Sequence, residues 1–391
     1  MNFRSSRVPH DLTPTPLAAA VARARASGRP LADLTQSNPT QAGIPYPVDL
    51  LAALADPAGL AYQPEPFGMM SARTAVAADY FRRGVVVPPE RLCLTASTSE
   101  AYALLFKLLC NPGDTVLVPR PSYPLFEHLI ALECVTAVPY ELELHGDWRL
   151  DISAVARLVD ERTRAVLIVS PNNPTGSVVN PAELEALAEL CAARGLALIG
   201  DEVFADYRLD GAPPGRSVLE QCQALAFGLG GLSKSVGLPQ VKVAWIGVSG
   251  PDALVADALT GLEIVADTYL SVSTPAQVAL SRLLSRGTVV REAIREWTAR
   301  NLTALTLAVA AAPAVTLLAP AGGWCAVLQV PSLVPEETLV QALIEHDGVL
   351  VQPGYFFDFP REAFVVVSLL VDPKVFTPAI ARLIARVTAA A

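Results

Sequence analysis

The chain contains few lysines. Only four occur among its 391 residues, Lys107, Lys234, Lys242 and Lys374, and the formal net charge is −9. Its basic side chains are scattered along the sequence rather than clustered. Because a nucleic-acid-binding surface requires clustered basic side chains, we expect no nucleic-acid partner. An acidic surface of this kind mainly favours solubility.

Cysteine and histidine show no pattern typical of a metal site. The cysteines form no CxxC pair, and the four histidines lack the spacing of metal ligands. Most of the cysteines lie in apolar runs, which favours buried free thiols in a reducing compartment. The six cysteines are Cys93, Cys110, Cys134, Cys191, Cys222 and Cys325. We therefore expect no metal and a cytoplasmic location.

Long hydrophobic runs are also scarce. The first sixteen residues have no apolar segment typical of a secretory signal. One stretch, 301–335, carries no charged residue, but Pro313, Pro320 and the Gly322-Gly323 pair would interrupt a membrane-spanning helix. We interpret this stretch as the end of an amphipathic helix, a turn and a buried strand. The sequence predicts no membrane partner.

Short apolar runs alternate with helical stretches in the first two thirds of the chain. The runs are apolar throughout, as strands buried on both faces should be. They lie at 91–95, 115–118, 135–139, 165–170, 196–200, 224–229 and 243–248. The helical stretches between them lie at 98–110, 124–133, 151–160 and 181–194. This alternation predicts an α/β fold with a mostly parallel, seven-stranded sheet that helices cover on both sides.

Beyond residue 251 the pattern becomes that of a smaller α+β domain. The elements predicted there are helices at 275–286, 288–311 and about 336–346, and strands near 324–330 and 363–370. We therefore expect three parts: an N-terminal segment (1–45) that packs on the small domain, a large ligand-binding domain (46–287) and the small C-terminal domain (288–391).

Lys234 differs from the other lysines in its surroundings. It follows the apolar run 224–229 at the end of the loop Gly230-Gly231-Leu232-Ser233-Lys234. Such a loop of small residues lets the backbone approach a ligand closely. An amine placed there can be desolvated and become nucleophilic. Lys107 lies within a predicted helix and Lys374 near the C-terminus, where a solvated role is ordinary.

Polar side chains follow two further strands of the predicted sheet. Asp201 ends the strand 196–200, and its carboxylate can pair with a pyridinium nitrogen. Asn173 lies in the rigid turn Pro171-Asn172-Asn173-Pro174-Thr175-Gly176, which follows the strand 165–170. Alone, these features have ordinary explanations, a strand-end acid and a turn.

A third strand end carries hydroxyl groups. The strand 91–95 leads to Ser97, Thr98 and Ser99 at the start of a predicted helix. Hydroxyls and free N–H groups at a helix N-terminus can bind phosphate, although a helix cap is the ordinary explanation. In a parallel sheet ligands bind beyond the carboxyl ends of the strands. The four features together therefore predict a site for pyridoxal phosphate (PLP) at Lys234.

The sequence resembles the class I/II aminotransferases, which are aspartate-aminotransferase-like PLP enzymes of fold type I. The resemblance covers nearly the whole chain from about Leu34. Its motifs are Asn173 to Gly176, Asp201 to Phe204 and Gly231 to Lys234. It implies a homodimer with shared sites that moves an amino group between an amino acid and a 2-oxo acid through a Lys234 aldimine.

The same resemblance implies roles for individual residues. Lys234 would carry the cofactor and shuttle protons, Asp201 would pair with the ring nitrogen, and Asn173 would bind the phenolic oxygen. Further contacts with the ring or phosphate are implied for Tyr123, which would stack on the ring, for Tyr62, which would reach across the dimer interface, and for Ser97, Thr98, Ser99, Phe204, Ser233 and Lys242. Substrate contacts are implied for Asn38, Tyr123 and Asn173.

Four positions depart from the family pattern. Phe204 replaces a tyrosine that binds the phenolic oxygen, and Gly231 replaces a serine that binds phosphate. Lys242 replaces an arginine, which keeps the charge but loses the two-pronged geometry. Val366 stands where the family has an arginine for the substrate carboxylate. Arg361, just before that strand, is the candidate replacement, although a solvated charge is an equally good explanation.

Two alternatives to an aminotransferase remain open. A β-elimination lyase, or another amino-acid-modifying PLP enzyme of a biosynthetic pathway, would use the same three residues Lys234, Asp201 and Asn173. The altered carboxylate site strengthens this alternative. A PLP-binding regulatory domain would normally come with a DNA-binding extension, and no helix-turn-helix pattern or basic segment precedes residue 35. The sequence leaves the amino donor and acceptor open.

Overall fold

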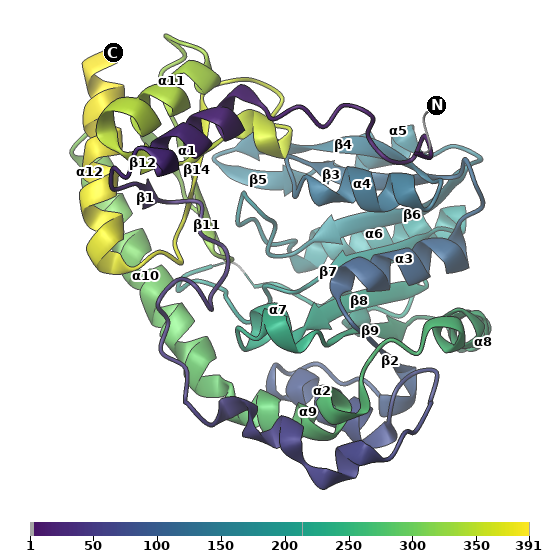
Figure 1. The fold of residues 1–391 in the computed structure, drawn as a ribbon. Coiled ribbons are helices and arrows are strands. Elements are labelled where there is room, and N and C mark those ends of the chain that lie inside the picture. The colour runs from purple at the N-terminus through teal and green to yellow at the C-terminus, as the bar shows by residue number, and fades with distance from the viewer. Residues whose placement is uncertain (1–3, 213, 391) are drawn as a thin grey trace.

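The computed structural model describes residues 4–212 and 214–390. Its largest element is an eight-stranded sheet in the order β2-β9-β8-β7-β6-β3-β4-β5 (Figure 1). In that order the strands span Leu92–Thr95, Ala244–Ser249, Ala226–Gly231, Ala197–Asp201, Thr163–Val169, Thr115–Arg120, Thr136–His145 and Asp147–Leu150. Only β9 and β5 run against their neighbours, so the predicted mostly parallel α/β fold is confirmed.

The predicted number of seven strands is wrong, because β5 adds an eighth at the edge of the sheet. It forms a hairpin with β4 through Gly146, whose φ of +84° suits glycine. Asp147 and Arg149 of β5 are exposed, so this strand has no apolar run by which the sequence could reveal it.

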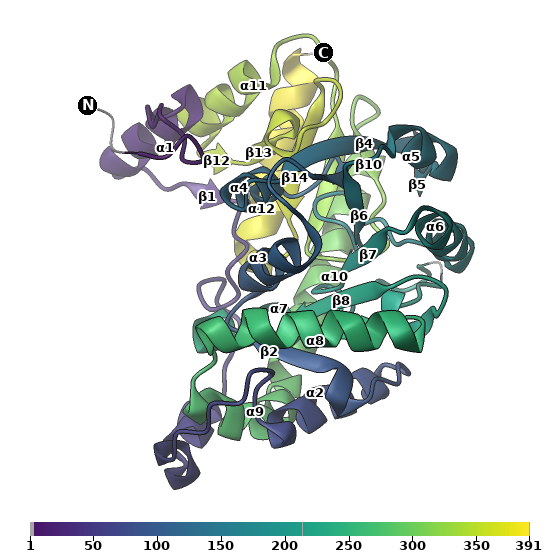
Figure 2. The same ribbon diagram turned by 90° about the vertical axis from the view of Figure 1, so that its right-hand side faces the viewer.

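Helices cover both faces of the large sheet (Figure 2), and the sheet separates the two hydrophobic cores that they form with it. One face is covered by α3 (Thr98–Leu109), α4 (Leu125–Leu132) and α8 (Asp252–Tyr269), and the other by α2 (Met70–Arg82), α5 (Ile152–Leu158), α6 (Pro181–Arg194) and α9 (Thr274–Arg286). Along β7, Leu198 faces the second core while Ala197 and Ile199 face the first. The strands are therefore buried on both faces, as their apolar sequences predict.

Among the described residues, five α-helices are not predicted from the sequence: α1 (Pro16–Ala26), α2, the single turn α7 (Leu232–Ser235), α8 and α12 (Pro373–Ala390). α8 begins after Pro251 without a side-chain cap, and α12 contains Pro378 within its span. A side-chain cap at the start and the absence of internal proline are local signals by which a sequence reveals a helix. α8 lacks the first signal and α12 contradicts the second.

A second, four-stranded antiparallel sheet lies in the C-terminal part of the chain, in the order β10-β11-β14-β13. Its strands span Thr316–Leu318, Cys325–Gln329, Phe364–Ser368 and Gln352–Pro353. One core of this part joins Val365 and Val367 of β14 to side chains of α11 (Glu336–Ala342) and α12. The elements predicted for this region, strands 324–330 and 363–370 and a helix at about 336–346, are present with slightly different ends, and the end of that helix, Leu343–Asp347, is π-helical.

The N-terminal segment lies beside this smaller part. Its strand β1 (Ala32–Asp33) pairs in parallel with β12 (Val349–Leu350), and α1 packs against α11 and the π-helical turn Leu343–Asp347 that follows it (Figure 1). The division of the chain at residues 45 and 287 stays a prediction. Among the described residues, no helix is long and apolar enough to cross a membrane.

The long helix α10 (Thr288–Ala310) runs from the large sheet region to the C-terminal part, where it packs on α12 (Figure 1). Asn301 lies within it and is fully buried. Its side-chain amide donates to the carbonyl oxygens of Leu369 (2.9 Å) and Val371 (2.7 Å), just beyond the end of β14. One side chain therefore attaches α10 to the smaller sheet.

We predict that Asn301→Leu lowers the free energy of unfolding by about 2 kcal/mol, because two buried carbonyls lose their donor. Thr303→Ala is the matched control, since the exposed Thr303 hydroxyl bonds only to Ala299 of the same helix. Urea unfolding of the apoprotein, followed by far-ultraviolet circular dichroism, measures both. Equal stability of the two variants would contradict the attachment.

Candidate active site

A cavity of about 290 Å³ opens at the carboxyl ends of the large sheet's parallel strands. Ten residues that the sequence analysis selected line it together: Ser97, Thr98, Ser99, Tyr123, Asn173, Asp201, Phe204, Ser233, Lys234 and Lys242. They come from six separate segments of the chain. The strand-end positions inferred from the sequence therefore converge on one place.

Lys234 lies in α7 (Leu232–Ser235), a single turn that follows β8. Its Nζ is 5.0 Å from the ring centre of Trp324 and 5.6 Å from that of Phe204. Burial lowers the pKa of the Lys234 amine, and the charge of Asp201 opposes that shift only in part. A buried lysine with a lowered pKa has a larger neutral, nucleophilic fraction.

Asp201 is the last residue of β7 and is buried at the base of the cavity. Its carboxylate accepts a hydrogen bond from the Tyr102 hydroxyl (2.8 Å) and one from the Val203 N–H (3.2 Å). Burial nevertheless raises the pKa of Asp201; the two hydrogen bonds and the Lys234 charge act in the opposite direction. A cationic ring nitrogen is the kind of partner that would favour its charged form.

Asn173 has a side-chain oxygen, Oδ1, that is buried without a hydrogen-bond partner among the described residues. The neighbouring Asn172 holds the turn, because its amide donates to Pro121 (3.1 Å) and Thr175 (2.8 Å). The Asn172 side chain therefore fixes the turn, and the Asn173 side chain lines the cavity. A buried amide with an unused polar atom requires a ligand or water to complete it.

Side chains with hydroxyl groups and a lysine also line the cavity. Ser97 caps α3 by accepting from the Glu100 N–H (3.1 Å), so its hydroxyl hydrogen stays available to a ligand. Lys242 is exposed at the cavity, with a left-handed φ of +58°. A Cβ on Gly231 would lie only 3.0 Å from the Ala244 Cβ, which gives a packing reason for glycine at this position.

Three residues selected from the sequence lie outside this cavity. Tyr62 is 73% exposed and lines a separate hollow beside Gln277. The Asn38 side-chain oxygen accepts hydrogen bonds from Thr40. Arg361 is exposed and lies over the ring of Phe364, 5.3 Å from its centre.

Several cavity residues were missed by sequence reasoning. Trp324, Cys325 and Ser368 reach the cavity from the smaller sheet, and Ser37 reaches it from the N-terminal segment. No strand-end or loop motif marks them, since their position depends on how the two sheets pack. Burial raises the pKa of the Cys325 thiol to about 12, so it remains protonated beside Lys234. The prediction of buried free thiols is wrong for the exposed Cys134 and Cys222, although all six cysteines are free.

Val366 lies on β14 and is 1% exposed. Side chains alternate along a strand, so Val366 shares its face with Phe364 and with Ser368, which lines the cavity. It packs in an apolar cluster whose members are Leu144, Trp148, Leu318, Cys325, Val327, Phe357, Phe359 and Phe364. Among the described residues the basic side chains that line the cavity are two lysines, Lys234 and Lys242.

This fold, with a lysine and an aspartate at adjacent strand ends, is that of the aminotransferases of fold type I. Alanine aminotransferase from Pyrococcus furiosus superposes with a TM-score of 0.85, covering 98% of each chain at 21% identity. The sequence model of the aminotransferases of class I and II matches residues 31–383. The chain therefore belongs to this family.

Two curated relatives show how far the sequence similarity extends. The chain is 31% identical over 303 residues to an arginine–pyruvate transaminase of Pseudomonas aeruginosa, which covers 77% of this chain and 76% of the relative. It is 29% identical over 267 residues to a glutamate–pyruvate aminotransferase of Escherichia coli. That match spans 67% of this chain and 65% of the relative's length.

The buried carboxylate generates a pH-dependent prediction. The folded protein binds the Asp201 proton more tightly than the unfolded chain does, since burial raises its pKa. The destabilisation from this group therefore grows as the pH rises from about 4 through the folded pKa. We expect Asp201→Asn to raise the free energy of unfolding of the apoprotein by about 1 kcal/mol at pH 8 and by little at pH 4.

Urea unfolding at several pH values measures this difference. Asp257→Asn, on the exposed side of α8, is the matched control and should show no such pH trend. A stability difference between Asp201→Asn and wild type that does not change with pH would show that Asp201 has the same pKa in both states.

Proposed function

We propose that the protein is a PLP-dependent aminotransferase that moves an amino group between an amino acid and a 2-oxo acid. The observation that carries the proposal is the convergence of Lys234, Asp201 and Asn173 on one cavity. When bound there, PLP supplies an electron sink that stabilises negative charge at the substrate carbon. The partly unsatisfied Asn173 and the buried Asp201 fit such a group.

The chain's own residues have distinct tasks in this proposal. Lys234 is the nucleophile that holds the cofactor, and its Nζ moves the substrate proton as a general base and acid. Asp201 keeps the ring nitrogen protonated, Asn173 binds the phenolic oxygen and Tyr123 stacks on the ring. The phosphate is held by Ser97, Thr98, Ser99, Ser233 and Lys242.

We further propose a cytoplasmic homodimer with shared sites. Tyr62 supports this part, because it is largely exposed and outside the cavity of its own chain, where it could complete the site of a second copy. The names of these two curated relatives support pyruvate as an acceptor and glutamate or arginine as a donor. Asn38 is proposed as a substrate contact from the segment that also brings Ser37 to the cavity.

A PLP-dependent β-elimination lyase is the second candidate. The observation that favours it is Val366, whose apolar surroundings leave no arginine on this face of β14 to hold a substrate carboxylate. Titrating the holoenzyme with a panel of amino acids and no acceptor separates the two candidates. Stoichiometric 2-oxo acid indicates an aminotransferase, whereas continuing release of pyruvate and ammonia indicates a lyase.

We predict that Lys234→Ala lowers kcat for amino-group transfer by about 10³-fold or more, because both the nucleophile and the proton carrier are lost. Borohydride reduction of the wild-type holoenzyme should fix the cofactor on the peptide that contains Lys234, as mass spectrometry would show. Lys374→Ala, exposed on α12, is the control and should retain wild-type labelling and rate. Labelling of a different lysine would overturn the assignment.

A further prediction concerns the arginine just before β14. Arg361 is exposed and lies outside the cavity, so Arg361→Ala should change the KM for amino donors by about twofold or less, within the range of ordinary surface substitutions. Steady-state kinetics with several donors checks this. A tenfold increase in KM would instead show that Arg361 reaches the substrate carboxylate in the working enzyme.

A further inference from the structure

The backbone carbonyls at and after Lys234 are bound by side chains from distant parts of the chain. The Tyr207 hydroxyl donates to the carbonyl oxygen of Lys234 (2.7 Å), and Arg291 Nε donates to that of Ser235 (2.7 Å). The Tyr46 hydroxyl donates to the carbonyl oxygen of Gly237 (2.6 Å). α7 is only one turn long, and its local backbone bonds are few: the Val236 N–H donates to the Leu232 carbonyl (3.4 Å) and the Gly237 N–H to the Lys234 carbonyl (3.3 Å). The side chains from distant segments add to these local bonds.

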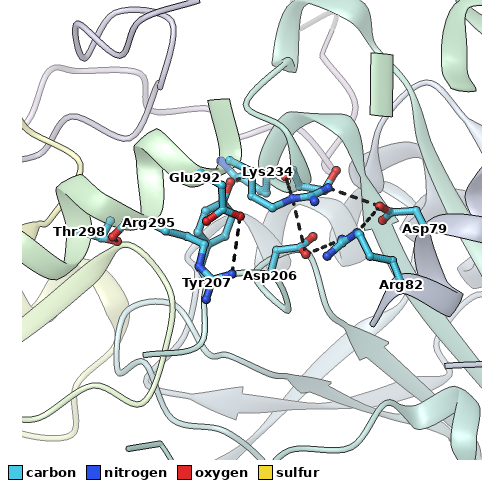
Figure 3. Close-up of polar contacts among 10 residues, drawn as sticks. Asp79, Arg82, Asp206, Tyr207, Lys234, Glu292, Arg295 and Thr298 are labelled. Atoms are coloured by element: carbon cyan, nitrogen blue, oxygen red, sulfur yellow. Dashed lines mark hydrogen bonds and ion pairs between the residues drawn. The ribbon is translucent and has the colours of Figure 1, made fainter. Parts of the chain in front are cut away.

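Arg291 belongs to a group of charged side chains near this loop, of which Figure 3 labels Asp79, Arg82 and Asp206. Its side chain is 2% exposed, and it lies 3.4 Å from Asp79 and 3.6 Å from Asp206. Arg82 completes the group, at 3.0 Å from Asp79 and 2.6 Å from Asp206. The two arginines and two carboxylates of this group have no net charge. The ion pairs hold the buried Arg291 in place, and its Nε donates to the Ser235 carbonyl.

We propose that Arg291 and Tyr207 are positioning residues that fix the direction in which the Lys234 side chain enters the cavity. Neither residue lines the cavity, so neither acts on a ligand directly. They bind the carbonyls on successive residues and thereby fix the peptide plane that follows the Lys234 Cα. The proposal depends on the proposed function only in making Lys234 the reactive amine.

The fixed backbone has a consequence for the lysine side chain. Lysine has four rotatable methylene bonds, and a mobile backbone would let the amine leave its place between Trp324 and Phe204. The amine also faces Asp201 and Cys325 within the cavity. Holding the Lys234 backbone keeps the amine in this enclosed setting, whereas loosening it lets the amine reach water.

Charge-conserving substitutions test the proposal most directly. Arg291→Lys keeps the positive charge but cannot bind the Ser235 carbonyl and the carboxylates at the same time. Tyr207→Phe removes only the hydroxyl that binds Lys234. Arg82→Lys is the matched control, because Arg82 bonds to the same two carboxylates and has no contact with the loop carbonyls.

The readout is the pKa of the Lys234 amine in the folded apoprotein, obtained from the rate of acetylation by acetic anhydride at a series of pH values. Mass spectrometry of the peptide containing Lys234 gives the rate. We expect Arg291→Lys and Tyr207→Phe each to raise this pKa by about 1 unit toward the ordinary lysine value, as the amine gains water. Arg82→Lys should keep the wild-type pKa.

A second readout uses the holoenzyme. The two test variants should lower kcat about tenfold while KM stays within about twofold, since the substrate contacts are unchanged and the proton carrier is misplaced. Wild-type acetylation profiles in both Arg291→Lys and Tyr207→Phe would overturn the proposal, even if both variants melt at lower temperature. If Arg291→Lys fails to fold, Tyr207→Phe alone decides. A shifted lysine pKa in a protein without transferase activity would refute the proposed function and leave the positioning role intact.

Discussion

The cavity depends on the burial of one amine and one carboxylate that face each other. Burial lowers the pKa of Lys234 and raises that of Asp201, so each group is pushed toward its neutral form. The sheet imposes this arrangement, since Asp201 ends β7 and Lys234 follows the adjacent strand β8. A ligand with a cationic nitrogen beside Asp201 would stabilise the charged form of that aspartate. If it also carried an electrophilic carbon beside Lys234, it would react with the neutral amine. The side-chain oxygen of Asn173, which is buried without a hydrogen-bond partner among the described residues, is a third group that such a ligand would satisfy.

The two walls of the cavity come from two sheets, and α10 connects them. Arg291 joins the first part of this helix to the lysine loop, and Asn301 joins its middle to the backbone just after Ser368. Ten residues of helix separate the two attachments, or about 15 Å along the axis. A rigid helix attached at both places fixes how far the smaller sheet stands from Lys234. A displacement of the smaller sheet would therefore be transmitted through α10 to the lysine loop by these buried hydrogen bonds.

The sequence predicts the parts of the site that are set by local order along the chain. Strand ends and loops place Asp201, Asn173 and Lys234. The remaining parts depend on contacts between distant segments. Tyr102 reaches Asp201 across 99 positions and Arg291 reaches Ser235 across 56, and neither has a distinguishing neighbour in the sequence. Trp324 and Cys325 likewise enter the cavity only because the smaller sheet packs where it does.

Local packing gives a physical cause for three of the four departures from the family pattern, those at Phe204, Gly231 and Val366. Phe204 lies edge-on to Trp324, with ring centres 5.2 Å apart, and a Cβ on Gly231 would press on Ala244. Val366 fills an apolar cluster in which an arginine would lie buried without a described carboxylate among the cluster's members. Each change replaces a polar or charged group with one that suits its apolar neighbours. Under the proposed function, the described lining offers a substrate carboxylate no arginine, so neutral donors such as the amide of Asn173 and the hydroxyl of Ser37 would share its binding with the cavity lysines. Neutral donors hold a carboxylate less strongly than a guanidinium does, so shape and apolar contact would then contribute more to substrate selection.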